Sequence, residues 1–138
     1  MTAMQVDGDF IADEPGQFDE HGMALSFFYY RNCDRASDYF LDEVGIGAEA
    51  RRSINRSTYS ATATLDVVEP VTRGTPLRFE ITVSRIGGKS VGYRVTMLGS
   101  KDDRVRAVYD TVGVCMDMTG PTPMAIPDEV REKLSAFV

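Results

Sequence analysis

The spacing of apolar residues changes once along the chain, and this change separates a helical part from a part made of strands. Between residues 24 and 47 apolar side chains recur at mostly three- and four-residue intervals, which is the spacing of one face of a helix. These positions are Leu25, Phe28, Tyr29, Cys33, Ala36, Tyr39, Phe40 and Val44. The pattern predicts one long helix over about 25–44, with Ser26 as a candidate N-cap and Gly45 as its stop.

Beyond residue 54 apolar and polar residues alternate, which predicts β-strands with one buried face. The predicted strands cover 57–68, 75–86, 89–98 and 104–118, and turn-forming residues separate them. The short link IGGKS between the second and third of these strands predicts an antiparallel hairpin.

The two ends of the chain are less regular. Residues 1–8 are polar and are expected to form a loose tail. The segment 9–19 is expected to hold a short strand, broken by the turn residues Pro15 and Gly16. Near the C-terminus, Pro127 is expected to begin a short amphipathic helix.

The chain length of 138 residues fits a single domain spanning 1–138. One apolar helix and about five antiparallel strands predict an α+β fold in which the helix packs across one face of the sheet. The order of the predicted elements is strand, long helix, four strands and short helix.

Charge and cysteine content narrow the functional classes. A net charge of −6 is unfavourable for binding nucleic acid, because neutralising phosphates needs a basic face. The two cysteines, Cys33 and Cys115, lack CxxC spacing and are expected to be buried thiols in a reducing cytoplasm, not zinc ligands. No apolar stretch approaches membrane-spanning length, and the N-terminal residues do not resemble a secretory signal.

The stretch FDEHGMALSFFYY, residues 18–30, places acidic side chains and a glycine directly before a run of aromatic residues. Asp19 and Gly22 form an Asp-x-x-Gly motif, and Tyr29 lies seven residues after the glycine. With the predicted helix and the later segment ATLDVVEPVTRGTPLRFEITVSRIGGKSVGYRVTML, this spacing resembles the hotdog-fold acyl-CoA thioesterases of the 4-hydroxybenzoyl-CoA thioesterase type. The chain departs from many relatives at Met23 and Leu25, where those proteins carry His and Asn.

The resemblance covers about residues 9–138, and the ending VCMDMTGPTPMAIPDEVREKL is most similar to the betainyl-CoA thioesterase branch. It implies a hotdog fold, in which the antiparallel sheet wraps round the long helix. It also implies cytoplasmic hydrolysis of a small or medium acyl-CoA, with no cofactor other than the CoA of the substrate. A homodimer or a dimer of dimers is implied, with sheets joined edge to edge and sites at the interface. Strands 104–118 and 89–98 are the candidate edges.

The resemblance assigns Asp19 as the catalytic carboxylate, acting either as a nucleophile or as a general base. Backbone amides around Gly22, Met23 and Ala24, at the mouth of the helix, are the expected donors to the developing oxyanion. Tyr29 is the third motif residue at the start of the helix. Phe28 is expected in an aromatic wall of the acyl pocket, which would suit an aromatic or a cationic acyl group, and His21 at the pocket rim.

The phosphates of CoA need cations, and Arg85, Lys89 and Ser90 flank the turn where family members often bind the nucleotide. Other arginines, at positions 51, 52, 56 and 73, are alternatives. The helix carboxylates Asp34 and Asp38 are alternatives to the catalytic aspartate, because some hotdog thioesterases carry their carboxylate on this helix. Two other functions remain open: an acyl-thioester dehydratase or isomerase, and a non-catalytic acyl-CoA-binding module.

Overall fold

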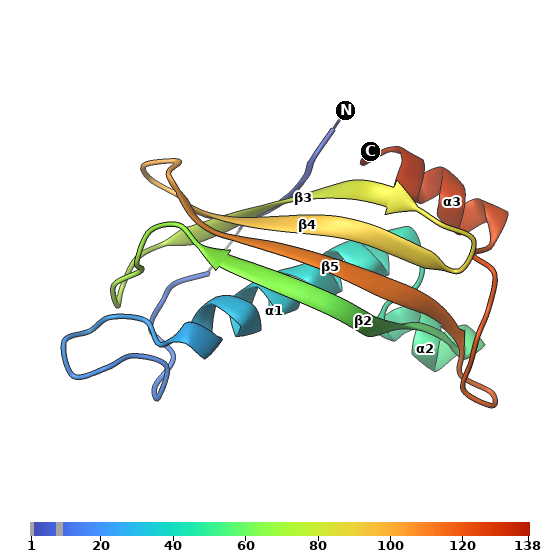
Figure 1. Ribbon diagram of the computed structural model, residues 1–138, viewed down its shortest axis with the longest axis horizontal. Coiled ribbons are helices and arrows are strands. Elements are labelled where there is room, and N and C mark those ends of the chain that lie inside the picture. Colours follow the sequence, from blue (N-terminus) through green and yellow to red (C-terminus); the bar gives the residue numbers. More distant parts are fainter. Residues whose placement is uncertain (1, 8–9) are drawn as a thin grey trace.

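The computed structural model describes residues 2–7 and 10–138, and it shows one long helix lying along one face of an antiparallel sheet (Figure 1). The strands are β1 (Met4–Val6), β2 (Arg56–Val67), β3 (Leu77–Ile86), β4 (Ser90–Gly99), β5 (Val105–Asp117) and β6 (Thr122–Pro123). The helices are α1 (Ser26–Val44), α2 (Ala48–Ile54) and α3 (Asp128–Ser135). The strand order is β1-β3-β4-β5-β2, with β6 paired to β5. The predicted α+β hotdog architecture is confirmed.

Side-chain alternation explains why the sheet has a helix-covered face. In β3 the apolar residues Leu77, Phe79, Ile81 and Val83 are buried, whereas the residues between them are partly exposed. Because successive side chains of a strand point to opposite faces, these four residues lie on the side that packs against α1. The core therefore forms between α1 and one face of the sheet.

Helix α1 follows the predicted range, but its first residue and its buried face differ in detail. The N-cap is Leu25, and no side chain caps this end, so the prediction of Ser26 as N-cap is wrong. Gly45 ends the helix in the left-handed conformation, with φ of 88°, as predicted. Tyr39, predicted on the buried face, is 57% exposed. Asn32 and Ser37, which the predicted face did not include, are buried, and each hydrogen-bonds a carbonyl group of the helix itself.

Several segments depart from the expectations. Residues 4–6 were expected in a loose tail, yet they form β1 and pair with β3. The expected strand over 9–19 is reduced to two isolated bridges, from Ile11 to Pro76 and from Phe18 to Ala24; residues 8–9 lie outside the described part of the chain. Helix α2 was not predicted. Both cysteines are buried and free, as expected, and none of the described helices is long and apolar enough to cross a membrane.

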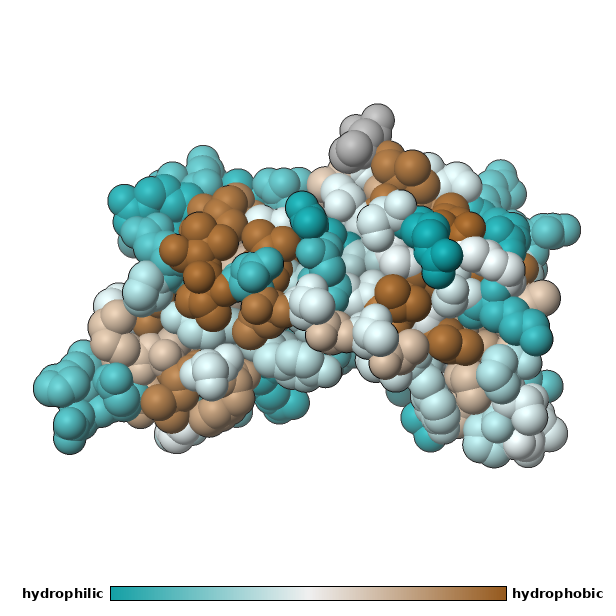
Figure 2. Space-filling view, in the orientation of Figure 1, coloured by the Kyte–Doolittle hydropathy of each residue, from teal (hydrophilic) through white to brown (hydrophobic). Residues whose placement is uncertain are grey.

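The free edges of the sheet are β1 and β2, so the prediction that β4 or β5 forms an edge is wrong. Both of those strands have a partner on each side. In β2 the side chains from Tyr59 to Thr64 are exposed. The side of the molecule that Figure 2 shows carries an apolar patch over the end of β2, where Val67 and Val68 are 47% and 59% exposed.

The two ends of the sheet carry different loops (Figure 1). At one end, the segment that follows β2 is hydrogen-bonded to the loop that precedes α1. At the other end, the turn between β3 and β4 contacts α3, because Arg131 donates to the Gly87 carbonyl group at 2.7 Å. Strand β2 begins at this second end, where Arg56 pairs with Glu129 of α3.

Candidate active site

The loop that leads into α1 is a tight turn built around Asp19. The N–H of Asp19 donates to the carbonyl oxygen of Met23 at 2.8 Å, and the N–H of Gly22 donates to the carbonyl oxygen of Asp19 at 3.0 Å. Gly22 has φ of 78°, a left-handed conformation that glycine adopts with little strain. The Asp-x-x-Gly motif is thus a turn motif, in which the glycine lets the chain reverse just before the helix.

The same turn holds the carboxylate of Asp19. Its Oδ1 atom accepts hydrogen bonds from the N–H groups of Met23, at 2.9 Å, and His21, at 2.8 Å. The Met23 bond is the main reason that the pKa of Asp19 is lowered; slight burial opposes it, and the His21 amide adds to it. Asp19 is exposed, and no hydrogen bond to its Oδ2 atom is found among the described residues. The group is therefore an ionised carboxylate with one uncommitted oxygen.

The amides expected to stabilise an oxyanion are already engaged. The N–H of Gly22 donates to Asp19, that of Met23 to the Asp19 carboxylate, and that of Ala24 to Val71 at 2.9 Å. In the described structure, the N–H groups of Ser26 and Phe27 have no acceptor. They lie in the first turn of α1, where backbone N–H groups lack partners and the helix dipole is positive. The available donors are thus a few residues further along than the sequence suggested.

A second segment that the sequence analysis missed lies against this loop. Residues 71–73, which follow β2, run antiparallel to residues 22–24: Ala24 donates to Val71, Arg73 donates to Gly22, and Met23 bridges Thr72. No sequence pattern marks this pairing, since it uses only backbone groups of segments about fifty residues apart. The segment fixes the turn that carries Asp19 onto the sheet.

The other members of the predicted site lie at different depths. Tyr29 is buried, and its hydroxyl group accepts a hydrogen bond from the N–H of Val71 at 3.0 Å. Phe28 is also buried and packs against Phe18, with ring centroids 5.2 Å apart. His21 is exposed, with its Nε2 atom 3.5 Å from a carboxylate oxygen of Glu20. Of the four consecutive aromatic residues, Phe27 and Tyr30 are the exposed ones, at 51% and 43%.

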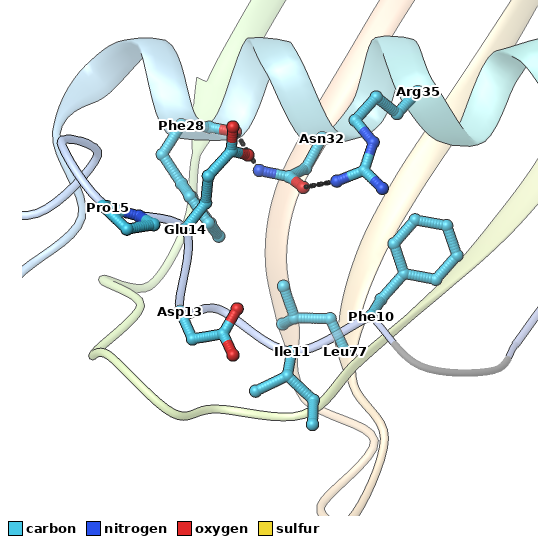
Figure 3. A pocket seen from close by; sticks show the side chains of 9 residues that line it. All are labelled: Phe10, Ile11, Asp13, Glu14, Pro15, Phe28, Asn32, Arg35 and Leu77. Carbon is cyan, nitrogen blue, oxygen red and sulfur yellow. Dashed lines mark hydrogen bonds between the residues drawn. The ribbon is translucent and has the colours of Figure 1, made fainter.

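A cavity of about 340 Å³ lies between α1 and the segment 10–15, on the helix flank that carries Asn32 and Arg35 (Figure 3). The buried Asn32 amide donates to the Phe28 carbonyl group at 2.9 Å, and its oxygen accepts from Arg35 at 3.4 Å. The lining residues are Phe10, Ile11, Asp13, Glu14, Pro15, Phe28, Asn32, Arg35 and Leu77. Phe28 reaches this cavity and Asp19 does not line it.

Arg85, Lys89 and Ser90 lie together at the opposite end of the sheet from Asp19. Arg85 donates to the Ser90 hydroxyl group at 3.3 Å, and the carbonyl group of Lys89 accepts from Cys115. Within one subunit, the predicted nucleotide-binding residues are thus separated from the predicted catalytic carboxylate by the length of the strands (Figure 1).

The alternative arginines are distributed differently. The side chain of Arg73 lies over the ring of Phe18 at 5.3 Å, directly beside the Asp19 turn. Arg56 is tied to Glu129 and to the Gly45 carbonyl group, which gives it a structural role. Arg51 and Arg52 are exposed on α2, at the end of the sheet where β2 begins.

The helix carboxylates Asp34 and Asp38 lie further along α1. Burial is the main cause that raises the pKa of Asp34, and the nearby Arg31 opposes it. Burial also raises the pKa of Asp38, and the neighbouring Asp34 carboxylate adds to this. Their environment is the opposite of that of Asp19, whose charged form is favoured by two amide donors.

Comparisons with known proteins agree with this architecture. A family model described as the thioesterase-like superfamily matches residues 15–134. A thioesterase superfamily protein from Jannaschia sp. CCS1 is 21% identical, with a TM-score of 0.85, covering 99% of this chain and 93% of that one. A protein from Staphylococcus aureus, solved in complex with CoA, is 9% identical with a TM-score of 0.86, covering 99% and 85%.

A 1,4-dihydroxy-2-naphthoyl-CoA thioesterase from Synechocystis is 12% identical with a TM-score of 0.76, covering 97% of this chain and 95% of that one. The comparison with curated proteins gives no match. These structural likenesses confirm the fold, and the family model, which spans most of the chain, confirms the thioesterase class that the motif resembles. The chain belongs to the thioesterase-like superfamily.

Proposed function

We propose that the protein hydrolyses a small or medium acyl-CoA at the turn that precedes α1, with Asp19 as the reacting carboxylate. The observation that carries this proposal is the hydrogen bonding and charge of the Asp19 side chain. Two amides hold Oδ1 and lower the pKa of the Asp19 carboxyl, so the group is charged at neutral pH. The residue is exposed, and among the described residues no hydrogen bond reaches Oδ2. A thioesterase needs such a group beside donors for the developing oxyanion.

The proposed chemistry uses the Asp19 carboxylate and the backbone N–H groups at the start of α1. The N–H groups of Ser26 and Phe27 are suited to donate hydrogen bonds to the thioester oxygen, where negative charge develops when the carbonyl carbon is attacked. In one scheme Asp19 attacks the carbon, the C–S bond breaks to release CoA, and water then hydrolyses the resulting anhydride. In the other, Asp19 takes a proton from the attacking water. Neither scheme needs a cofactor beyond the CoA of the substrate.

We also propose a homodimer that joins two β2 strands edge to edge. Strand β2 is a long free edge whose side chains are exposed from Tyr59 to Thr64, and such an edge is normally covered. A two-fold axis pairs the strands antiparallel, which brings the partner's Arg56 end beside this subunit's Val67 end. The Asp19 turn lies at the Val67 end, because residues 71–73 bind it there.

This pairing would bring together the two separated parts of the predicted site, Asp19 and the nucleotide-binding turn. The turn with Arg85, Lys89 and Ser90 lies at the end of the sheet where β2 begins, since Lys89 contacts Cys115 and residue 115 pairs with Thr58. In the antiparallel dimer the partner's copy of this turn therefore lies at the end of the sheet that carries Asp19 of this subunit. We therefore propose that each site combines Asp19 of one subunit with the nucleotide-binding turn of the other. The buried free thiols Cys33 and Cys115 agree with a cytoplasmic location.

A panel of acyl-CoAs, read by the release of free thiol, tests the proposed activity. The panel holds short-chain, aromatic and trimethylammonium acyl groups, and it is measured with the wild type, Asp19→Asn and Asp34→Asn. We expect turnover of at least one substrate by the wild type and by Asp34→Asn, and its loss in Asp19→Asn. Turnover that is lost in Asp34→Asn and kept in Asp19→Asn would move the catalytic carboxylate onto α1. Tight CoA binding with no turnover by the wild type would show a binding module.

A further inference from the structure

The hydroxyl group of Tyr29 makes a hydrogen bond that no local feature of the helix requires. It accepts the N–H of Val71 at 3.0 Å across 42 positions of sequence. Val71 is fully buried, and Tyr29 is 3% exposed. Solvent water therefore does not reach the Val71 N–H, and the Tyr29 hydroxyl group is its hydrogen-bond partner. Leaving a buried N–H without a partner is strongly disfavoured.

Val71 is also joined to the Asp19 turn. Its carbonyl oxygen accepts the N–H of Ala24 at 2.9 Å, and the next residue, Thr72, bridges Met23. The N–H of Met23 in turn donates to the Asp19 carboxylate at 2.9 Å. A set of hydrogen bonds and backbone links therefore runs from the Tyr29 hydroxyl group, through Val71 and the segment 22–24, to Oδ1, the anchored oxygen of the candidate catalytic carboxylate.

The rest of the segment is held from the other side. The N–H groups of Val68 and Glu69 both donate to the carbonyl oxygen of Arg106, at 2.8 and 3.1 Å. The Arg106 side chain is buried and bound to Asp102 at 2.9 Å, so this support is itself fixed. Between these anchors the chain passes Pro70, whose ring restricts the backbone. The Tyr29 bond is thus the point at which α1 sets the position of the segment.

We propose that Tyr29 is a positioning residue, which acts on catalysis by fixing the segment 71–73 and through it the geometry of the Asp19 carboxylate. This inference rests on the proposed function of Asp19. It gives Tyr29 a role without contact with the substrate. A displacement of a reacting group by about 1 Å costs on the order of 100-fold in rate, so a hydrogen bond remote from the chemistry is sufficient to matter.

The test compares Tyr29→Phe with Tyr93→Phe, in the full-length protein and with the acyl-CoA that the wild type turns over best. Tyr93 is also a buried tyrosine in the same core, and its ring packs against Phe40 of α1 with ring centroids 5.0 Å apart, far along the helix from residues 22–24. For Tyr29→Phe we expect kcat to fall by at least about tenfold while KM stays within about threefold. Tyr93→Phe is expected to keep kcat near the wild-type value.

The pH profile adds a measurement that a general loss of core packing does not change. If the Met23 amide moves away from Asp19, the pKa of that carboxyl rises toward its ordinary value. The acidic limb of kcat/KM, and the carboxyl titration of Asp19 followed by NMR, then move to higher pH in Tyr29→Phe and not in Tyr93→Phe. An unchanged kcat and titration in a folded Tyr29→Phe protein overturn the proposal, as does an equal loss of kcat in both variants without a shift in titration.

Two further results keep the inference separate from the proposed function. If Asp19→Asn retains full turnover, the proposed function fails whatever the tyrosine variants do. If Tyr29→Phe does not fold, hydrogen exchange of the wild type decides, because the inference requires the Val71 amide to be protected as strongly as amides in the centre of β4. Rapid exchange at Val71 overturns it.

Discussion

The carboxylate of Asp19 is set apart from the other acidic side chains near the start of α1 by its two amide donors. Hydrogen bonds to the charged form of an acid lower its pKa, whereas burial raises it. Asp19 is of the first kind, and Asp34 and Asp38 are of the second. The three candidates for the catalytic carboxylate therefore differ in the direction of their pKa shift, which the pH dependence of the kinetics measures.

The pH dependence of kcat/KM separates them. Because the pKa of Asp19 lies below the ordinary aspartate value of 3.8, its charged form persists as the pH falls, and it is lost only below that value. We expect kcat/KM between pH 3 and 7 to stay level until the pH drops below about 4. Circular dichroism at each pH serves as the control for unfolding. An acidic limb well above pH 4 in the folded protein would indicate a carboxyl whose pKa is raised, such as Asp34.

The residues of the motif could be identified from the sequence, but the free backbone amides and the hydrogen-bond partner of Tyr29 could not. The spacing of Asp19, Gly22 and Tyr29 placed all three correctly in one region of the fold. The free amides belong to Ser26 and Phe27, and a side chain carries no information about whether its own backbone N–H has an acceptor. The contact of Tyr29 with Val71 depends on two segments meeting in the folded chain.

Helix α1 begins without a capping side chain, and in the described structure its first N–H groups, those of Ser26 and Phe27, have no acceptor. Leu25 occupies the N-cap position with an extended backbone, at φ of −74° and ψ of 158°. A serine or threonine at this position normally accepts the N–H of the second or third helical residue. We interpret the missing cap as the feature that keeps these donors available for the substrate.

Leu25→Ser tests this interpretation, with Leu25→Ala as the matched control. Both variants lose the packing of the leucine, but only serine adds an acceptor for the Phe27 N–H. We expect the serine variant to be more stable than the alanine variant by about 1 kcal/mol. It should also have a lower kcat, because the new cap competes with the thioester oxygen. Chemical denaturation and steady-state kinetics give the two numbers. Equal kcat values for the two variants would mean that these amides take no part in turnover.

Alternation was sufficient to locate β2 to β5. In β3 and β5 the period of two coincides with one buried face, whereas β2 keeps the period in sequence although both of its faces are exposed from Tyr59 to Thr64. The same pattern did not show which strand forms the edge. Strand β2 alternates like the others in sequence, yet after Tyr59 its exposed stretch consists of serine, alanine and threonine residues that suit either face. A bulge between Ser60 and Thr62 also shifts its register against β5. Edge position is set by topology, which alternation does not record.

The proposed dimer makes a prediction that depends on the whole assembly. If each site joins Asp19 of one subunit to Arg85 and Lys89 of its partner, two inactive variants complement each other. We expect Asp19→Asn co-expressed with the double variant Arg85→Ala/Lys89→Ala to regain activity, since each mixed dimer has one site with both wild-type elements. Random mixing gives about a quarter of the wild-type number of intact sites.

Light scattering on the same samples checks that the protein is a dimer or a larger assembly. Activity that stays at the level of the separate variants would show that both elements of the site come from one subunit. A monomer with full activity would remove the need for a shared site altogether.

The central claim is that one ionised carboxylate, held in its own turn before α1, carries out the reaction. The most direct measurement is kcat/KM for the best acyl-CoA with Asp19→Asn and with Glu20→Gln, an exposed neighbour that makes no hydrogen bond within the described turn. We predict that Asp19→Asn loses on the order of 10²- to 10⁴-fold in kcat/KM with the fold and assembly intact, and that Glu20→Gln stays close to the wild type. Full activity in Asp19→Asn would contradict the account.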